Sequence, residues 1–364
     1  PRRGCYRLQS DIMKKIERRK SDHIEVTLKE NVVPDYDYWS DVRLVHRALP
    51  EVDLDDIDTS VTLFGKRLDM PLVITAITGG FPLAMDINRN LAEACAKAGV
   101  GFGVGSQRPS IENGDDGTYS VVKDFDVPLV IGNVGAPQLV EQKGKRAFTI
   151  DDVLRAQEVI GADIMAIHLN FLQEVVQPDG DVNAKGCLDG IRALAREGPC
   201  MVKETGAGIS RETALMLKGT GIRGIDVSGV GGTSFAAVEM HRAKAQGNGT
   251  ATALGLTFCD WGIPAPAAVL EADVGLEIIS SGGVDNGLRM AKGLAIGANA
   301  AGCARAVLAE AMESSQAVLD KINEMKAELK AAMFLTGCST VDDLRMRRVM
   351  IGGRTADWLT ASED

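Results

Sequence analysis

Eight short apolar runs lie between residues 71 and 304, and a longer stretch of helical periodicity separates each from the next. An apolar run that is bounded by turn residues and too short for a helix indicates a strand buried on both faces. Such strands in alternation with helices are typical of a parallel sheet. The runs begin at Pro71, Val100, Pro128, Ala162, Pro199, Gly221, Gly275 and Ala298.

Eight strand and helix units in roughly 240 residues match a (β/α)8 TIM barrel, whereas an open doubly wound sheet usually has fewer. Helices are predicted over residues 86–99, 149–162 and 286–298, each opening near a capping residue and closing on or beside glycine. The sequence therefore predicts an α/β barrel over residues 71–335, which includes one or two closing helices. An N-terminal extension (1–70) precedes it and a C-terminal tail (336–364) follows.

The net charge of -10 disfavours nucleic acid and anionic membranes, because both are bound by basic surfaces. No apolar run reaches the roughly 18 residues of a membrane span, and none follows the basic start as in a secretory signal. Seven scattered cysteines without a Cys-x-x-Cys pair indicate neither a disulfide framework nor a zinc site. We expect a cytoplasmic protein whose phosphate-bearing partners are small molecules.

Polar or glycine residues follow all eight predicted strands, at the end of a β/α barrel where catalysis occurs. Helix capping or chain turning could explain any one of them. Eight together favour a functional site. The set comprises Thr75, Thr78, Gly79, Gly80, Ser106, Gln107, Arg108, Asn133, Asn170, Gln173, Glu174, Lys203, Glu204, Ser228, Thr233, Gly282, Gly283, Ala304 and Arg305.

The last two strand ends, "SSGG" and "GCAR", lie where such barrels commonly bind phosphate through backbone N–H groups. Two ordinary tight turns are the alternative. Lys203 ends a strand that is otherwise apolar, so its ammonium should project into the barrel mouth. An electron-rich partner such as a reduced flavin would suit it, and an internal ion pair with Glu204 or Glu174 is the alternative.

Several motifs between Arg19 and Ala306 together resemble the type 2 isopentenyl-diphosphate isomerases, which are flavin-dependent β/α-barrel enzymes. One departure is Arg305, where the family pattern leads us to expect an apolar residue. The motifs are "RKSDHIE", "HRALPE", "TAITGG", "GVGSQR", "HLNFLQEVVQPDGD", "VKETGAGIS", "DVSGVGGTS", "WGIP" and "SGGVDNGL".

The resemblance implies interconversion of isopentenyl and dimethylallyl diphosphate with FMN and Mg²⁺, NADPH or another reductant reducing the flavin, and a homotetramer or homooctamer. It implies Glu174 as the Mg²⁺ ligand and Gln173, Glu239 and Lys203 as catalytic residues. The implied substrate-binding residues are Arg19, Lys20, His23, Ser106, Gln107, Arg108, Asn170 and Gln173. The implied FMN-binding residues are Thr75, Ala76, Ile77, Thr78, Ser106, Asn133, Lys203, Ser228, Thr233, Gly282, Gly283, Val284, Cys303 and Ala304.

The implied reaction protonates one alkene carbon and deprotonates another, so the site must exclude water from a cation-like species. Gln173 has no usable pKa and cannot be the acid. We therefore expect reduced FMN to serve as acid and base through its N5, with Gln173 orienting the substrate.

Two other functions are open on the same barrel. A flavin-linked 2-hydroxy-acid oxidase or dehydrogenase would need a histidine base and an arginine pair on the late strands, whereas His241 lies in a predicted helix. His168 lies two residues before Asn170, with the apolar Leu169 between them, and we expect its side chain to face the outer helices. A non-catalytic flavin or nucleotide sensor would have no use for the set of Arg19, Lys20, Asn170, Gln173 and Glu174, which argues against it.

The assigned role of the cofactor predicts that 5-deaza-FMN or an N5-alkylated flavin will not support isomerisation. Replacing or blocking N5 removes the proton-transferring atom while leaving the rest of the ring to bind. The measurement is dimethylallyl diphosphate formation from isopentenyl diphosphate with each flavin after reduction. Full turnover with either analogue would show that another group moves the proton.

Overall fold

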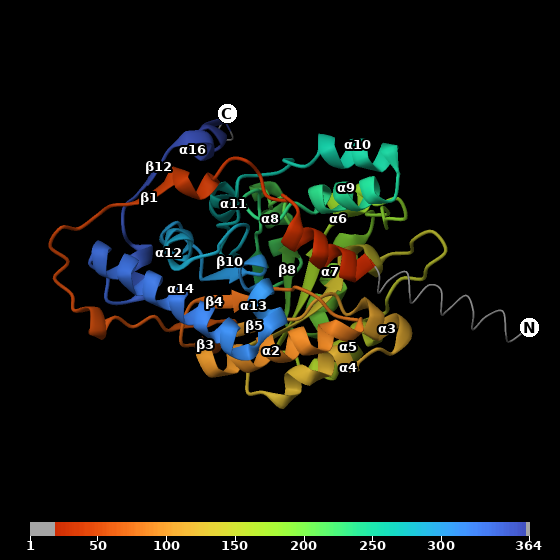
Figure 1. The fold of residues 1–364 in the computed structure, drawn as a ribbon, viewed down its shortest axis with the longest axis horizontal. Helices are drawn as coiled ribbons and strands as arrows, with labels where there is room; N and C mark the ends of the chain where they lie inside the picture. The colour runs from red at the N-terminus through yellow and green to blue at the C-terminus, as the bar shows by residue number, and fades with distance from the viewer. Residues whose placement is uncertain (1–18, 362–364) are drawn as a thin grey trace, which may run out of the picture.

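The computed structural model describes residues 19–361. Eight parallel strands close into a barrel in which β11 pairs with β4, and helices surround it (Figure 1). Each of the eight predicted apolar runs contains one of these strands, so the predicted (β/α)8 TIM barrel is confirmed. The strands are β4 (Leu72–Ile74), β5 (Gly101–Gly103), β6 (Val130–Gly135), β7 (Ile164–Leu169), β8 (Cys200–Glu204), β9 (Gly224–Asp226), β10 (Glu277–Ser280) and β11 (Ala300–Cys303).

The helices around the barrel follow the predicted capping residues. Thr149 begins the helix after β6 with a capping box, and Gly161 ends it in a left-handed conformation. The helix predicted from Asp86 starts four residues earlier, because Pro82 is well suited to the first turn. The outer helices are α2 (Pro82–Ala98), α5 (Ile150–Ile160), α7 (Cys187–Glu197), α8 (Arg211–Lys218), α9 (Phe235–Ala245), α11 (Ala265–Glu271), α12 (Gly287–Ala295), α13 (Leu308–Glu313) and α14 (Ser315–Thr336).

Four further helices lie in the connections between the barrel strands and the outer helices. They are α3 (Arg108–Asn113), α4 (Gly117–Ser120), α6 (Phe171–Val176) and α10 (Gly249–Thr257). Within residues 19–361, no helix has both the length and the apolar character that crossing a membrane requires.

A hairpin from the N-terminal extension closes the barrel at the end opposite the site. Its strands are β2 (Val61–Leu63) and β3 (Lys66–Leu68). Leu63 and Leu68 are fully buried in one apolar cluster with barrel residues such as Ile164 and Met201. The backbone N–H of Phe64 donates to the Glu277 carboxylate of β10 (N···O 2.9 Å), which fixes the hairpin to the barrel.

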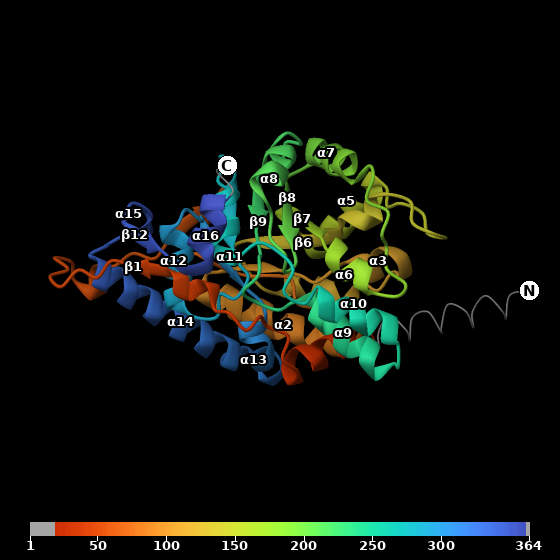
Figure 2. The same cartoon turned by 90° about the horizontal axis from the view of Figure 1, so that it is seen from above.

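The two ends of the described chain pair with each other. Strand β1 (Val42–Leu44) pairs antiparallel with β12 (Val349–Ile351) (Figure 2). In the sequence, β12 lies between the helices α15 (Val341–Arg345) and α16 (Gly353–Ala361). The Asp41 carboxylate, which is buried, accepts from the backbone N–H and the hydroxyl of Thr355 at 2.9 and 2.8 Å. The segment predicted as a tail is therefore folded onto the N-terminal extension.

Residues 19–29 form a helix beside the mouth of the barrel, drawn in red between α9 and α13 in Figure 1. Val26 of this helix packs against Ala237 of α9. The Ser234 N–H donates to the Val32 carbonyl (2.7 Å), and the Arg305 guanidinium donates to the Thr27 carbonyl (3.3 Å). These contacts hold the predicted diphosphate-binding residues of the extension next to the strand ends.

Replacing Leu63 with alanine should destabilise the fold by about 2–5 kcal/mol, because it leaves a cavity where the hairpin fills the base of the barrel. The measurement is the free energy of unfolding in denaturant. Leu54→Ala is the matched control, since Leu54 is 47% exposed and its loss should cost under about 0.5 kcal/mol. Equal effects of the two substitutions would show that the hairpin does not support the barrel.

Candidate active site

A cavity of about 680 Å³ opens where the barrel strands end. It brings together most of the predicted FMN-binding residues and three of the predicted substrate-binding residues, Ser106, Asn170 and Gln173. The predicted residues that line it are Thr75, Ala76, Ile77, Ser106, Asn133, Asn170, Gln173, Lys203, Ser228, Thr233, Gly282, Gly283, Val284, Cys303 and Ala304.

Two glycine-rich loops form one end of the cavity. Gly282 and Gly283 have φ of +78° and +92°, and a Cβ on either would collide with the backbone of the loop that begins at Ser228. The two loops therefore pack backbone against backbone. Among residues 19–361, the N–H groups of Gly282, Gly283 and Ala304 donate no hydrogen bond, so they remain available to an anion such as a phosphate.

Lys203 enters the cavity from β8 without a carboxylate partner. Its ammonium donates to the Glu204 backbone carbonyl (3.3 Å). The Glu204 carboxylate instead accepts N–H bonds from Gly206, Ala207 and Gly208 (2.6, 2.5 and 2.8 Å), so the alternative Lys203–Glu204 ion pair does not form.

Asp226 lies near Lys203 and also lines the cavity, although it was not among the predicted site residues. Burial raises the pKa of Asp226, which the Lys203 charge and a hydrogen bond from the Ser281 hydroxyl partly counteract. Asp226 is the register partner of Lys203 on the adjacent strand β9, so the two groups interact while both still line the cavity.

His168 lines the cavity, so the prediction that it faces the outer helices is wrong. Ile164 and Ala166 of the same strand belong to the interior cluster, and strand alternation places His168 on their side. That alternation was visible in the sequence. Burial, followed by the Lys203 charge, lowers the pKa of His168 to about 3, and its Nδ1 lies 2.8 Å from the Asn133 amide oxygen. The ring is therefore neutral at physiological pH.

Asn170, Gln173 and Glu174 connect the cavity to a group of charged residues beside it. The Asn170 amide nitrogen donates to Glu174 (2.8 Å), and the Gln173 amide nitrogen donates to Glu239 of α9 (3.0 Å). The buried Asn170 Oδ1 has no hydrogen-bond partner among residues 19–361. An unpaired buried oxygen is costly, which suits a site completed by a ligand.

Glu239 is the most heavily bonded carboxylate in this group. It accepts from His23 Nε2 (2.7 Å), from Gln173 and from Arg242, which is a further residue absent from the predicted set. Burial alone would raise the pKa of Glu239, but the His23 hydrogen bond and the His23 and Arg242 charges outweigh it and lower the pKa to about 2. Burial lowers the pKa of His23, while the hydrogen bond to Glu239 and the Glu239 charge oppose that shift.

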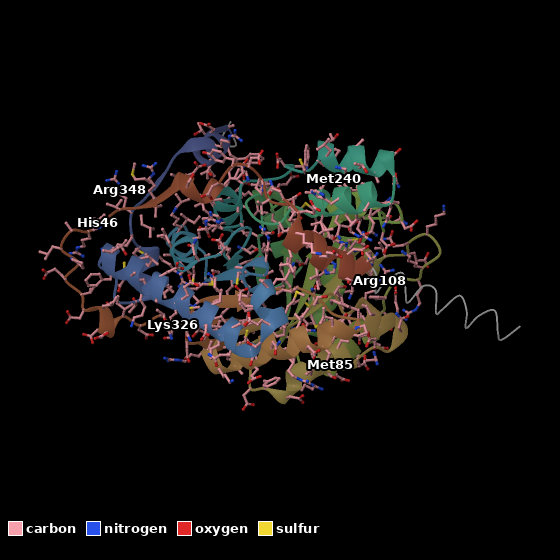
Figure 3. The ribbon with its side chains drawn as sticks, in the orientation of Figure 1. His46, Met85, Arg108, Met240, Lys326 and Arg348 are labelled. Carbon is pink, nitrogen blue, oxygen red and sulfur yellow. The ribbon has the colours of Figure 1, made fainter. Side chains whose placement is uncertain are left out.

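Arg19, Lys20 and Arg108 form a cationic cluster beside the cavity rather than in its lining. Burial is the main cause that lowers the pKa of Arg19, and the nearby Arg108 charge adds to it. Figure 3 shows Arg108 close to the red helix of residues 19–29. The Lys20 ammonium donates to the carbonyls of Gly79 and Ser106, the latter at 3.4 Å. Burial and the Arg19 charge lower the pKa of Lys20 to about 7.

Two predicted contacts are not supported by the geometry. Gln107 is fully buried, donates to the Ala156 carbonyl (2.7 Å) and accepts from the Asn133 N–H (3.0 Å), so its amide bridges β6 and α5 and does not line the cavity. Thr78 does not line the cavity, and its carbonyl accepts from the Gly105 N–H (3.1 Å). Both side chains follow strand ends, but tertiary packing turns them inward.

No cluster of three acidic, histidine or cysteine side chains that could hold a metal exists within residues 19–361. Burial raises the pKa of Glu174, while hydrogen bonds from the Asp181 N–H and from Asn170 oppose the rise. A cation next to this carboxylate would favour its ionised form. A Mg²⁺ ion held by one carboxylate, substrate phosphates and water is compatible with this donor set.

A closed parallel barrel with backbone N–H groups at its mouth that are unpaired within residues 19–361 defines a β/α-barrel protein that can bind a phosphate-bearing ligand. The profile of one family, described as FMN-dependent dehydrogenase, matches residues 8–115 and 168–350. A crystal structure of mandelate oxidase with 3,3-difluoro-2-hydroxy-3-phenylpropionic acid superposes with a TM-score of 0.61 at 18% identity, covering 94% of this chain and 99% of that one. At that identity the likeness concerns the fold.

Relatives with higher sequence identity identify a narrower family. The isopentenyl-diphosphate delta-isomerase of Thermoplasma volcanium is 46% identical over 94% of this chain and 99% of its own length. The enzyme of the same name from Archaeoglobus fulgidus is 42% identical over 94% and 98%. The chain belongs to the isopentenyl-diphosphate delta-isomerases, which fits the resemblance found in its motifs.

Inorganic pyrophosphate should bind less tightly as pH rises above about 7, because Lys20 then loses its positive charge. The affinity should fall by up to about tenfold per pH unit. Lys20→Arg stays charged and should lose little affinity over this range. The measurement is calorimetric titration of both proteins, and their ratio cancels the titration of pyrophosphate itself. A ratio that does not change with pH would contradict the lowered pKa.

Proposed function

We propose that this chain interconverts isopentenyl diphosphate and dimethylallyl diphosphate, with reduced FMN in the cavity and Mg²⁺ at Glu174. The observation that carries the proposal is the joining of two sites. Asn170 and Gln173 line the flavin-sized cavity and are hydrogen-bonded to Glu174 and Glu239, which lie among the cations beside it. A short hydrocarbon attached to a diphosphate would span these two sites.

The residues of the cavity fit FMN. The free N–H groups of Gly282, Gly283 and Ala304 would hold its phosphate, and Lys203 would lie beside the ring, where it would favour an anionic reduced form. Reduced FMN supplies the acid–base chemistry of the reaction when bound. NADPH or another reductant would be needed to reduce it, although the isomerisation has no net redox change.

The cationic cluster would hold the diphosphate. Arg19 and Arg108 are guanidinium groups that suit phosphate oxygens, and Lys20 adds a point charge. Glu174 would share a Mg²⁺ ion with the same oxygens. Because Arg19 and Lys20 belong to the helix of residues 19–29, the substrate would link this helix to the barrel and fix the hydrocarbon over the cavity.

Gln173 and Glu239 would act on the hydrocarbon side. Gln173 can orient an alkene but has no proton to transfer at neutral pH. Glu239 is ionised, so it can stabilise a nearby positive charge, but it is not a proton donor, and its lowered pKa makes it a weak base. Asn170, whose buried amide oxygen has no hydrogen-bond partner among the described residues, also lines the cavity and completes a set of three oxygen-bearing side chains.

Water must be kept from a cation-like species, and apolar residues from outside the barrel serve that purpose. Leu28, Val33 and Phe235 line the cavity on its open side. Leu28 belongs to the helix that carries the diphosphate ligands, so substrate binding would also close the apolar cover.

A 2-hydroxy-acid oxidase would need a histidine base in the cavity. His168 is in the cavity, but its lowered pKa and its hydrogen-bonding distance to Asn133 make it a weak base held by a neighbour. A sensor would have no need of the acidic and cationic groups next to the cavity. We also propose a cytoplasmic setting, with which the six free cysteines within residues 19–361 agree, and a homotetramer or homooctamer.

One assay tests the proposed function. The purified protein is incubated with isopentenyl diphosphate, Mg²⁺ and pre-reduced FMN, and dimethylallyl diphosphate is measured. Activity that depends on reduced FMN is the expected result. Turnover of a 2-hydroxy acid in place of the isomerisation, or flavin binding without any turnover, would overturn it in favour of the oxidase or the sensor.

Replacing Glu174 with glutamine should lower activity at limiting Mg²⁺ and raise the half-saturating Mg²⁺ concentration by roughly tenfold or more, because a carboxylate ligand is lost. High Mg²⁺ should restore part of the activity. Glu25→Gln is the control, since Glu25 lies on the exposed side of the helix of residues 19–29 and pairs with Lys29. An unchanged Mg²⁺ dependence in the Glu174 variant would exclude the ligand role.

A further inference from the structure

Asp181 ends the motif "HLNFLQEVVQPDGD" and belongs to none of the sets assigned above. It is 4% exposed and follows a turn that doubles back on α6. A Cβ on Gly180 would collide with the Glu174 backbone oxygen, so the turn requires glycine there. The tight turn brings Asp181 next to the carboxylate at the start of the same segment.

Asp181 contacts the predicted metal ligand and a predicted diphosphate ligand with different parts of its structure. Its backbone N–H donates to Glu174 Oε2 (2.7 Å). Its side-chain Oδ2 accepts from Arg108 Nη1 (2.7 Å). The distance between the carboxylate and the guanidinium therefore depends on one residue.

The contact with Asp181 also determines which way the Arg108 guanidinium points. Glu112 holds Nε (2.8 Å) and Asp181 holds Nη1, whereas Nη2 has no hydrogen-bond partner among residues 19–361. A guanidinium is planar, so fixing two of its nitrogens fixes the direction of the third. Nη2 is then free to bind an anion.

Two cationic side chains hold the Asp181 carboxylate despite its burial. The Lys145 ammonium donates to Oδ1 (2.5 Å), and the Gln138 amide approaches Oδ2 at 3.4 Å. Because each carboxylate oxygen has a cationic partner, Asp181 has a defined orientation as well as a charge.

We propose that Asp181 is a positioning residue that aligns Arg108 for the substrate diphosphate and sets its spacing from Glu174. This inference rests on the proposed function. Arg108 alone could adopt many rotamers, and a carboxylate that is itself anchored at both oxygens limits them before substrate arrives. Lys145 and Arg108 together offset the Asp181 charge, which limits its repulsion of the diphosphate.

The test uses Asp181→Asn in the FMN-loaded enzyme, which keeps the backbone N–H on Glu174 and removes the charge from Arg108. We expect the KM for isopentenyl diphosphate to rise about tenfold, kcat to change less than about threefold, and the half-saturating Mg²⁺ concentration to stay the same. Glu112→Gln is the matched control, because it removes the other, more exposed carboxylate from Arg108 and should raise KM less.

A double-mutant cycle separates alignment from general damage. In an Arg108→Gln background, Asp181→Asn should raise KM no further, since the group it positions is gone. Additive effects, or a fall in KM of the single variant, would overturn the proposal. Should the asparagine variant fold poorly, Asp181→Glu keeps the charge, moves it by one methylene and should still raise KM. If the unaltered enzyme makes no dimethylallyl diphosphate, the proposed function itself fails.

Discussion

Closure of the barrel is the constraint on which the site depends. The register that pairs Ala301 with Leu72, Gly302 with Val73 and Cys303 with Ile74 joins the last strand to the first. Without that seam the glycine loop after β10 and the polar residues after β4 would lie at opposite edges of a sheet. Closure, with the β2–β3 hairpin filling the base, puts every carboxyl end around one opening.

The buried charged groups around the opening are only partly stabilised by one another. Arg19 and Lys20 are cations with lowered pKa values, and Glu174 is a carboxylate whose pKa burial raises. Each of these groups loses hydration on folding and gains only part of it back from its neighbours. A bound anion would supply the missing partners of the two cations, so folding prepares these groups for an anionic ligand.

The barrel and the strand-end residues could be predicted from the sequence, because strand length and the glycines that end strands and helices are local properties. The eight strands and the strand-end residues of the cavity lining follow from them. Gln107 was misassigned because its position after a strand does not reveal that its amide bridges β6 and α5. Arg242 and Asp181 were missed because their roles depend on contacts with Glu239 and Arg108. The spacing of residues along the sequence does not reveal such contacts. The β1–β12 pairing joins segments about 300 residues apart and has no local pattern.

The pairing of the chain ends has a mechanical consequence for the cofactor site. Thr355 in α16 donates two hydrogen bonds to the buried Asp41 carboxylate. Trp39, two residues before Asp41, donates from its indole to the Gly282 carbonyl (3.0 Å). Trp39 is fully buried, and its own carbonyl accepts from the Lys292 ammonium (2.6 Å). Helix α16 is thus connected, through Asp41 and Trp39, to the glycine loop at Gly282. This helix therefore helps to shape one end of the cavity, although it is far from that loop in sequence.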